Sequence, residues 1–214
     1  MKNFFKYQEN TKSLRQPRHP VLCAMDLFGL AALCILCVMY RPNALMLVLL
    51  LTMGGVYLAS TMYHWFRYKE LLHKLDHQMI VLLIGFTFVP YWLTYGVPMW
   101  RLSALLSLTL VLAVVRWHWF EREKLGAVLY LAVAAFPIST SLQESFGWMP
   151  LHAAIEFWVG ISCYGLNFVV HHLKQPDPVP GLFGWRETQH IFVLLSITLQ
   201  AHVLLEYCKA VALR

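Results

Sequence analysis

The sequence contains few charged residues: 13% of its 214 residues are Asp, Glu, Lys or Arg, whereas 59% are hydrophobic. Soluble domains carry about 25% charged and about 45–50% apolar residues. Together with a mean hydropathy of +0.56, this composition excludes a soluble domain, a disordered chain and a disulfide-stabilised scaffold. The net charge is +6, but the basic residues lie between apolar runs, so they do not indicate a surface that binds nucleic acid.

Cysteine is also scarce, and its positions do not indicate a structural disulfide. The five cysteines all lie in or beside apolar runs, where a free thiol behaves as a small apolar side chain. The chain shows no low-complexity segment and no internal repeat. No small-residue cleavage site follows the first apolar run, so we expect that run to be an uncleaved first span.

Long apolar runs dominate the rest of the sequence. A bilayer core about 30 Å thick requires about 20 helical residues per span, and seven such runs joined by short loops fill most of the chain. We therefore predict an all-α, polytopic protein of the inner (plasma) membrane, with an N-terminal segment 1–19 and a seven-helix membrane domain 20–212. The predicted spans are residues 20–40, 44–66, 77–95, 99–117, 125–142, 149–172 and 188–212.

Lysine and arginine are divided unequally between the two sides of this arrangement. Thirteen of the 17 lie in the N-terminal segment and in every second loop after it, or beside those loops. Because positive charge is retained on the cytoplasmic side, the N-terminus is predicted to be cytoplasmic and the C-terminus to lie outside.

This topology predicts the outcome of reporter fusions. A reporter fused after Lys124 is expected on the cytoplasmic side, and one fused after Arg214 on the opposite side. Localisation of both reporters on the same side would contradict seven spans.

Four polar residues are predicted to lie at one membrane depth on the cytoplasmic side. Ser60 and His64 share one face near the end of the second span, Asp76 opens the third span, and His190 lies in the first turn of the seventh. Imidazole is a common zinc ligand, and catalytic zinc usually has three protein ligands and a water. A neighbouring carboxylate orients that water or accepts its proton, so this group is a candidate metal site.

Other ionisable residues receive simpler interpretations. Asp26 is an acid within the first span without an obvious partner, and His19 is assigned to the membrane interface. His152 and Glu156, one helical turn apart, are interpreted as a hydrogen-bonded pair or a second polar cluster.

Two of these segments resemble a known family. The stretch Ser60-Thr61-Met62-Tyr63-His64, followed by KLDHQMIVLLIGFTFVPYWL from Lys74, resembles the hemolysin III / progestin and adipoQ receptor family. The resemblance is strong over residues 59–93 and weaker over 126–132 and 180–196. It implies seven spans, a cytoplasmic N-terminus and a zinc ion held by three histidines. One of these histidines belongs to the second span and two to an H-x-x-x-H motif in the seventh, and an aspartate contacts the water on the zinc.

Carried over by position, His64 matches the ligand of the second span, Asp76 the acid and Ser60 the serine. The last motif departs from the family pattern. One alignment puts Arg186 at the first histidine and His190 at the second.

A second alignment, based on the preceding Pro180-Gly181, makes His190 the first histidine and Leu194 the second. Both alignments keep His190 and lose one ligand. Arginine cannot replace that ligand, because it stays protonated.

Glu187 is our candidate for the third metal ligand, because it lies three residues before His190 and can reach the same helix face. A Glu-x-x-His pair on one helix binds metal in other folds. A histidine at a neighbouring helix end is the alternative source: His77, His171 or His172. Without a third ligand, Arg186 favours an anion or a lipid headgroup in the same place.

The resemblance implies a zinc-dependent hydrolase of lipid amide or ester bonds, or a role in membrane-lipid homeostasis, with membrane lipids as partners. In the hydrolase, zinc at His64 and His190 would activate a water and Asp76 would act as base. The alternative is a non-catalytic, receptor-like or regulatory membrane protein with a degenerate metal site. A channel or transporter fits less well, because the sequence shows no acidic ring and no pair of broken helices.

Overall fold

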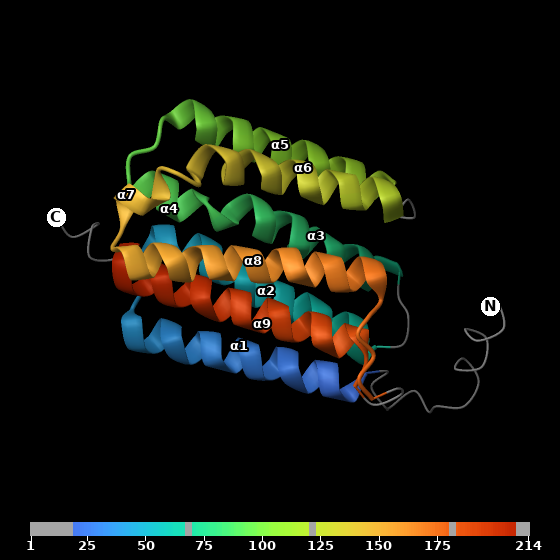
Figure 1. Ribbon diagram of the computed structural model, residues 1–214. Helices are drawn as coiled ribbons and strands as arrows, with labels where there is room; N and C mark the ends of the chain where they lie inside the picture. Colours follow the sequence, from blue (N-terminus) through green and yellow to red (C-terminus); the bar gives the residue numbers. More distant parts are fainter. Residues whose placement is uncertain (1–18, 67–69, 120–122, 180–182, 209–214) are drawn as a thin grey trace, which may run out of the picture.

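The computed structural model describes residues 19–66, 70–119, 123–179 and 183–208, which form a bundle of long helices (Figure 1). In chain order the helices are α1 (Pro20–Tyr40), α2 (Ala44–Trp65), α3 (Glu70–Thr87), α4 (Val89–Thr94), α5 (Met99–His118), α6 (Glu123–Ser141), α7 (Ser145–Trp148), α8 (Leu151–Leu173), α9 (Trp185–Val203) and the π-helical turn η1 (Leu204–Cys208).

Within the described residues, seven helical segments are long and apolar enough to cross a membrane, which confirms the predicted number of spans. The third segment differs from the prediction, because it covers Glu70–Thr94 and begins before residue 77. The reason is that the charged stretch is itself helical, with Lys74 and Glu70 paired one turn apart. Asp76 therefore lies in the second turn of α3 and does not open the span.

The third segment is interrupted where the sequence places a proline. α3 ends at Thr87 and α4 begins at Val89, with Pro90 in its first turn, because proline has no N–H to continue the helical hydrogen bonds. The short α4 is then tied to other helices. The hydroxyl of Tyr91 donates to the carbonyl of Gln200 at 2.9 Å, which joins this segment to α9.

Helix α3 lies at the centre of the bundle, with α5 and α6 on one side and α2, α8 and α9 on the other (Figure 1). Helix α1 packs against both α2 and α9. Gly29 of α1 permits this close packing, because a Cβ atom there would come within 2.6 Å of both Leu194 and Tyr57. The contact holds the preceding turn of α1, which carries Asp26, against α9.

Alternating helix directions bring several helix ends together at one end of the bundle. We call this the basic end: α1, α3, α6 and α9 begin there, and α2, α5 and α8 end there (Figure 1). Away from it, large apolar side chains such as Phe28 and Val38 are more than 70% exposed, as expected of surfaces that face lipid.

Candidate functional site

A hydrogen bond between α1 and α9 lies at the centre of the candidate site. His190 Nδ1 is 2.9 Å from Oδ1 of Asp26, a residue 164 positions away in sequence. Asp26 is only 1% exposed. An ionised carboxylate can only accept hydrogen bonds, so the imidazole donates from Nδ1 and keeps a lone pair on Nε2 when it is neutral. The aspartate thereby sets the tautomer and the orientation of His190.

Helix α2 brings a second imidazole to this pair. His64 lies in the last turn of α2 and is 7% exposed. Its ring is edge-to-face with the ring of His190, with a centroid separation of 5.9 Å. Ser60, one turn earlier, is buried, and its hydroxyl oxygen has no hydrogen-bond partner among the described residues.

A second group of charged and polar side chains lies around His19, the residue directly before α1. The ring of His19 lies 5.3 Å from that of His64. Arg186 donates from Nη1 to His19 Nε2 at 3.1 Å, so the proton of a neutral His19 is on Nδ1. This Nδ1 faces Glu187 Oε1 at 3.7 Å. The group places one fixed positive charge and one carboxylate beside His64.

Glu187 also caps its own helix. Its Oε2 accepts a hydrogen bond from the N–H of Gly184 at 2.9 Å, and the side chain is 8% exposed. A carboxylate in this position is favourable at the N-terminus of a helix. To act as a metal ligand, Glu187 would have to release this cap or contribute Oε1 alone, so its role as a ligand stays a prediction.

Asp76 approaches the same group from α3. Its carboxylate lies close enough to His190 and Asp26 to interact with both electrostatically, and the residue is partly buried. It also interacts with Tyr130 of α6 on the other side of α3. Asp76 therefore lies between the Asp26–His190 pair and the part of the bundle formed by α5 and α6.

The structure thus brings together the sites predicted from the sequence, since Ser60, His64, Asp76 and His190 all line the basic end. Their functional roles stay predictions. Two further members of the site were not predicted, namely Asp26 and His19. The sequence signal for Asp26 was its charge inside an apolar span, which is costly without a partner.

The donor atoms suit an imidazole-binding metal ion, because two histidines from different helices lie side by side and one is oriented by a carboxylate. Oδ2 of Asp26 is a second buried oxygen without a hydrogen-bond partner among the described residues. A complete ligand set is not assembled: in the described part of the chain, no group of three or more His, Cys, Asp or Glu side chains is arranged to hold a metal ion. The site therefore offers donor atoms of the kind that bind a metal ion, but its third protein ligand is not identified.

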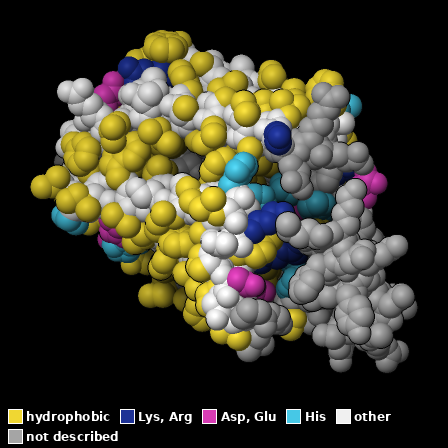
Figure 2. Space-filling model, turned by 45° about the vertical axis from the view of Figure 1, so that its right-hand side comes forward, with side chains coloured by type: hydrophobic (Ala, Val, Ile, Leu, Met, Phe, Trp, Pro, Cys, Tyr) yellow, Lys and Arg dark blue, Asp and Glu magenta, His cyan; other side chains and the backbone are white. Residues whose placement is uncertain are grey.

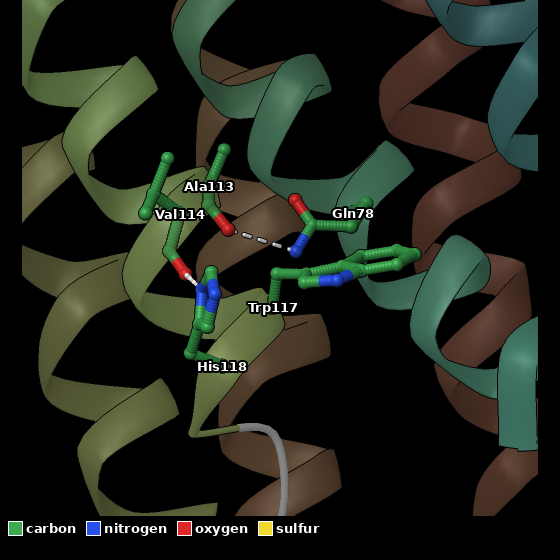
Figure 3. A pocket seen from close by; sticks show the side chains of 5 residues that line it. All are labelled: Gln78, Ala113, Val114, Trp117 and His118. Atoms are coloured by element: carbon green, nitrogen blue, oxygen red, sulfur yellow. Dashed lines mark hydrogen bonds between the residues drawn. The ribbon is translucent and has the colours of Figure 1, made fainter.

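The surface of the molecule separates the polar end from the apolar flanks. In Figure 2, histidine, lysine and arginine side chains gather at the basic end, beside the residues drawn in grey, whereas hydrophobic side chains cover most of the remaining face. A shallow, largely apolar groove of about 250 Å³ lies elsewhere, between α3 and α5; Figure 3 shows the side chains around it. It is lined by Gln78, Ala113, Val114, Trp117 and His118. None of the predicted site residues lines this groove, so it is separate from the candidate site.

Comparison with known proteins agrees with this arrangement of helices and polar residues. No curated protein matches the sequence. The family described as haemolysin-III related matches residues 8–201, which confirms the resemblance found in the motifs around Ser60 and Asp76. This multi-pass membrane protein with seven apolar helices belongs to the haemolysin-III related family.

Proposed function

We propose that the protein binds a divalent metal ion, with zinc as the expected ion, at the basic end through His64 and His190, and that it hydrolyses amide or ester bonds of membrane lipids. The observation that carries this proposal is the Asp26–His190 hydrogen bond beside His64. Histidines that bind metal usually donate their other ring N–H to a carboxylate or carbonyl. We place the site at the cytoplasmic face of the inner (plasma) membrane, on the basis of the lysine and arginine distribution.

A bound metal ion would supply Lewis-acid chemistry by polarising the carbonyl of an acyl group. The chain itself supplies the remaining functions. Asp26 holds His190 in one tautomer, and Asp76 is the general base that takes a proton from the attacking water. The buried hydroxyl of Ser60, one turn from His64, has no partner among the residues that the structure describes and is suited to a hydrogen bond with the substrate or with that water.

The location of the site favours a lipid substrate. The polar cluster lies at one end of a bundle of apolar helices, where the apolar membrane-facing surface gives way to charged side chains. Lipid amides and esters carry their reactive carbonyl at this boundary between the polar headgroup and the acyl chain.

Arg186 supports the alternative, a non-catalytic regulatory or receptor-like protein with a degenerate site. Its guanidinium reaches His19, whose ring lies beside that of His64, and a fixed positive charge disfavours a dication. In a regulatory protein, the positive charge of Arg186 would attract a lipid headgroup or another anion. Metal content separates the two functions.

The experiment is elemental analysis of the purified protein together with zinc titration of the wild type and of His64→Ala. We expect the purified wild type to retain about one equivalent of zinc, as in sites with one catalytic ion, and the purified variant to retain none. Glu187→Gln compared with His172→Gln then tests the third ligand, with release of zinc expected only for Glu187→Gln. Absence of zinc from the purified wild type, together with a zinc titration that His64→Ala leaves unchanged, would exclude the hydrolase and favour the regulatory function.

The role of Asp76 is tested with the pair Asp76→Asn and Glu70→Gln. Asparagine keeps the shape of the side chain and removes the base, so a loss of about 100-fold or more in the turnover of lipid amides or esters is expected. Glu70 is an exposed carboxylate paired with Lys74 on the same helix, and its replacement should leave turnover unchanged. Equal effects of the two substitutions would contradict the role assigned to Asp76.

A further inference from the structure

A second pair of imidazoles lies on α3, apart from His64 and His190. His73 and His77 are four residues apart and therefore share one face of the helix. Their Nε2 atoms share a hydrogen bond of 3.2 Å and their ring centroids are 4.9 Å apart; a metal ion would replace the proton between the two nitrogens. Two nitrogens that each lie ~2.0–2.1 Å from a tetrahedral metal ion are separated by ~3.3 Å. The two Nε2 atoms thus have the spacing of two ligands of one ion.

Each ring is oriented by a separate neighbour. His77 Nδ1 is 3.1 Å from the hydroxyl oxygen of Tyr130 in α6. The ring of His73 stacks on Tyr63, with centroids 4.5 Å apart and planes 6° from parallel. A partner on the other nitrogen of a ligating histidine fixes the ring and raises affinity for the metal, and Tyr130 is placed to be that partner for His77.

The charges around the pair partly cancel. Arg116 donates from Nε to the hydroxyl of Tyr130 at 3.4 Å, and its charge opposes binding of a cation. Asp76 precedes His77 in the chain and interacts electrostatically with the same tyrosine. His171 of α8 also interacts electrostatically with His77, so a further imidazole belongs to the surroundings. Because one carboxylate and one guanidinium lie near the pair, their charges offset each other, and the surroundings do not strongly repel a dication held by nitrogen ligands.

We propose that His73 and His77 bind a divalent first-row transition-metal ion, with solvent in the remaining coordination positions. Histidines at positions i and i+4 of a helix bind zinc in this way in other folds. Tyr63 stands between His73 and His64, with its ring centroid 4.7 Å from that of His64, so this ion is separate from one at His64 and His190. Two imidazole ligands hold copper more tightly than zinc, and the ion exchanges readily because two protein ligands make an open site.

The experiment uses the tag-free, full-length protein in detergent, with His64→Ala and His190→Ala introduced together to remove the site of the proposed function. Cu²⁺ is added alone and followed by electron paramagnetic resonance. We expect about one bound equivalent whose spectrum shows coupling to two nitrogens. Adding His73→Gln should abolish the two-nitrogen coupling, because only one imidazole of the pair remains.

The matched control is His118→Gln in the same background. His118 ends α5, and its Nδ1 lies 2.9 Å from the carbonyl of Val114 (Figure 3), so its removal should leave the copper signal unchanged. In the same background, Tyr130→Phe keeps both imidazoles of the pair. It is expected to weaken Zn²⁺ binding by the pair about 10–100-fold, as loss of the hydrogen-bond partner of a ligand does.

Three results would overturn the proposal. One is a copper spectrum of the background variant that lacks two nitrogen ligands, a result that needs no folded His73→Gln protein. Another is an unchanged signal after His73→Gln. The third is that His118→Gln removes the signal as completely as His73→Gln does. None of these results depends on whether His64 and His190 bind zinc.

Discussion

Replacing Asp26 with asparagine is expected to weaken zinc binding by the wild-type site about 10–100-fold, the usual effect of removing the carboxylate partner of a ligating histidine. Asparagine keeps the size of the side chain, so the helices stay packed. It lacks the negative charge that makes His190 a stronger ligand, and its amide can also turn its NH₂ group towards the ring. The effect would arise without any change in a residue that contacts the metal.

Zinc competition titrations of the purified protein measure this effect, with Glu70→Gln as the control for loss of one negative charge. Glu70 is exposed and pairs with Lys74 within α3, so its replacement should leave the affinity for zinc unchanged. If Asp26→Asn and the control bind zinc equally well, the Asp26–His190 pair does not support a metal ligand.

The same pair also contributes to stability without metal. Asp26→Ala leaves the Nδ1–H of His190, a side chain that is 15% exposed, without its acceptor; an unsatisfied buried donor costs ~1–3 kcal/mol, and the partial exposure puts the expected cost at the lower end of that range. Thermal unfolding in detergent with a chelator present separates this cost from any contribution of the metal. A chelator-treated Asp26→Ala protein as stable as the wild type would mean that the hydrogen bond does not hold α1 to α9.

Replacing Arg186 with histidine is expected to tighten zinc binding at least about tenfold, a change that corresponds to only ~1.4 kcal/mol. The substitution removes a fixed positive charge and creates an H-x-x-x-H pair with His190 on one face of α9. Two unit charges 4 Å apart interact with about 4 kcal/mol at an effective dielectric constant of about 20, so relief of repulsion alone can supply part of the gain.

Arg186→Gln separates the two contributions, because glutamine removes the charge and adds no imidazole. We expect Arg186→Gln to bind zinc more tightly than the wild type and less tightly than Arg186→His, measured by the same competition titration. If glutamine and histidine give the same gain, position 186 acts by charge and not as a ligand. A sharp rise from a very low wild-type occupancy in Arg186→His would identify the chain as a degenerate family member and favour the regulatory function.

The sequence by itself determined the number of spans and most of the candidate site. Apolar runs of about 20 residues can only be membrane helices in a chain this poor in charge, and their short loops force alternating directions. That alternation brings the end of the second span and the beginnings of the third and seventh to one side. Ser60, His64, Asp76 and His190 could therefore be assigned to one depth before any contact was known.

Only the tertiary structure decided which polar groups pair with one another. Hydrophobic periodicity fixes the length and the lipid-facing side of a helix, but it does not specify which helices are neighbours around the bundle. Asp26 had no partner in the sequence because its partner, His190, is supplied by the packing of α1 against α9, which Gly29 permits. His19 likewise joins the site through α9, by its contact with Arg186.

The beginning of the third span was also not predictable from the sequence. Its charged beginning was assigned to a loop, because hydropathy detects the part of a helix that lies in lipid and not its extension into water. The structure begins α3 at Glu70, which puts His73 and His77 on one helix face and brings their Nε2 atoms together. Their spacing was visible in the sequence, but the convergence of the two rings depends on Tyr63 and Tyr130 from neighbouring helices, and only helix packing determines those contacts.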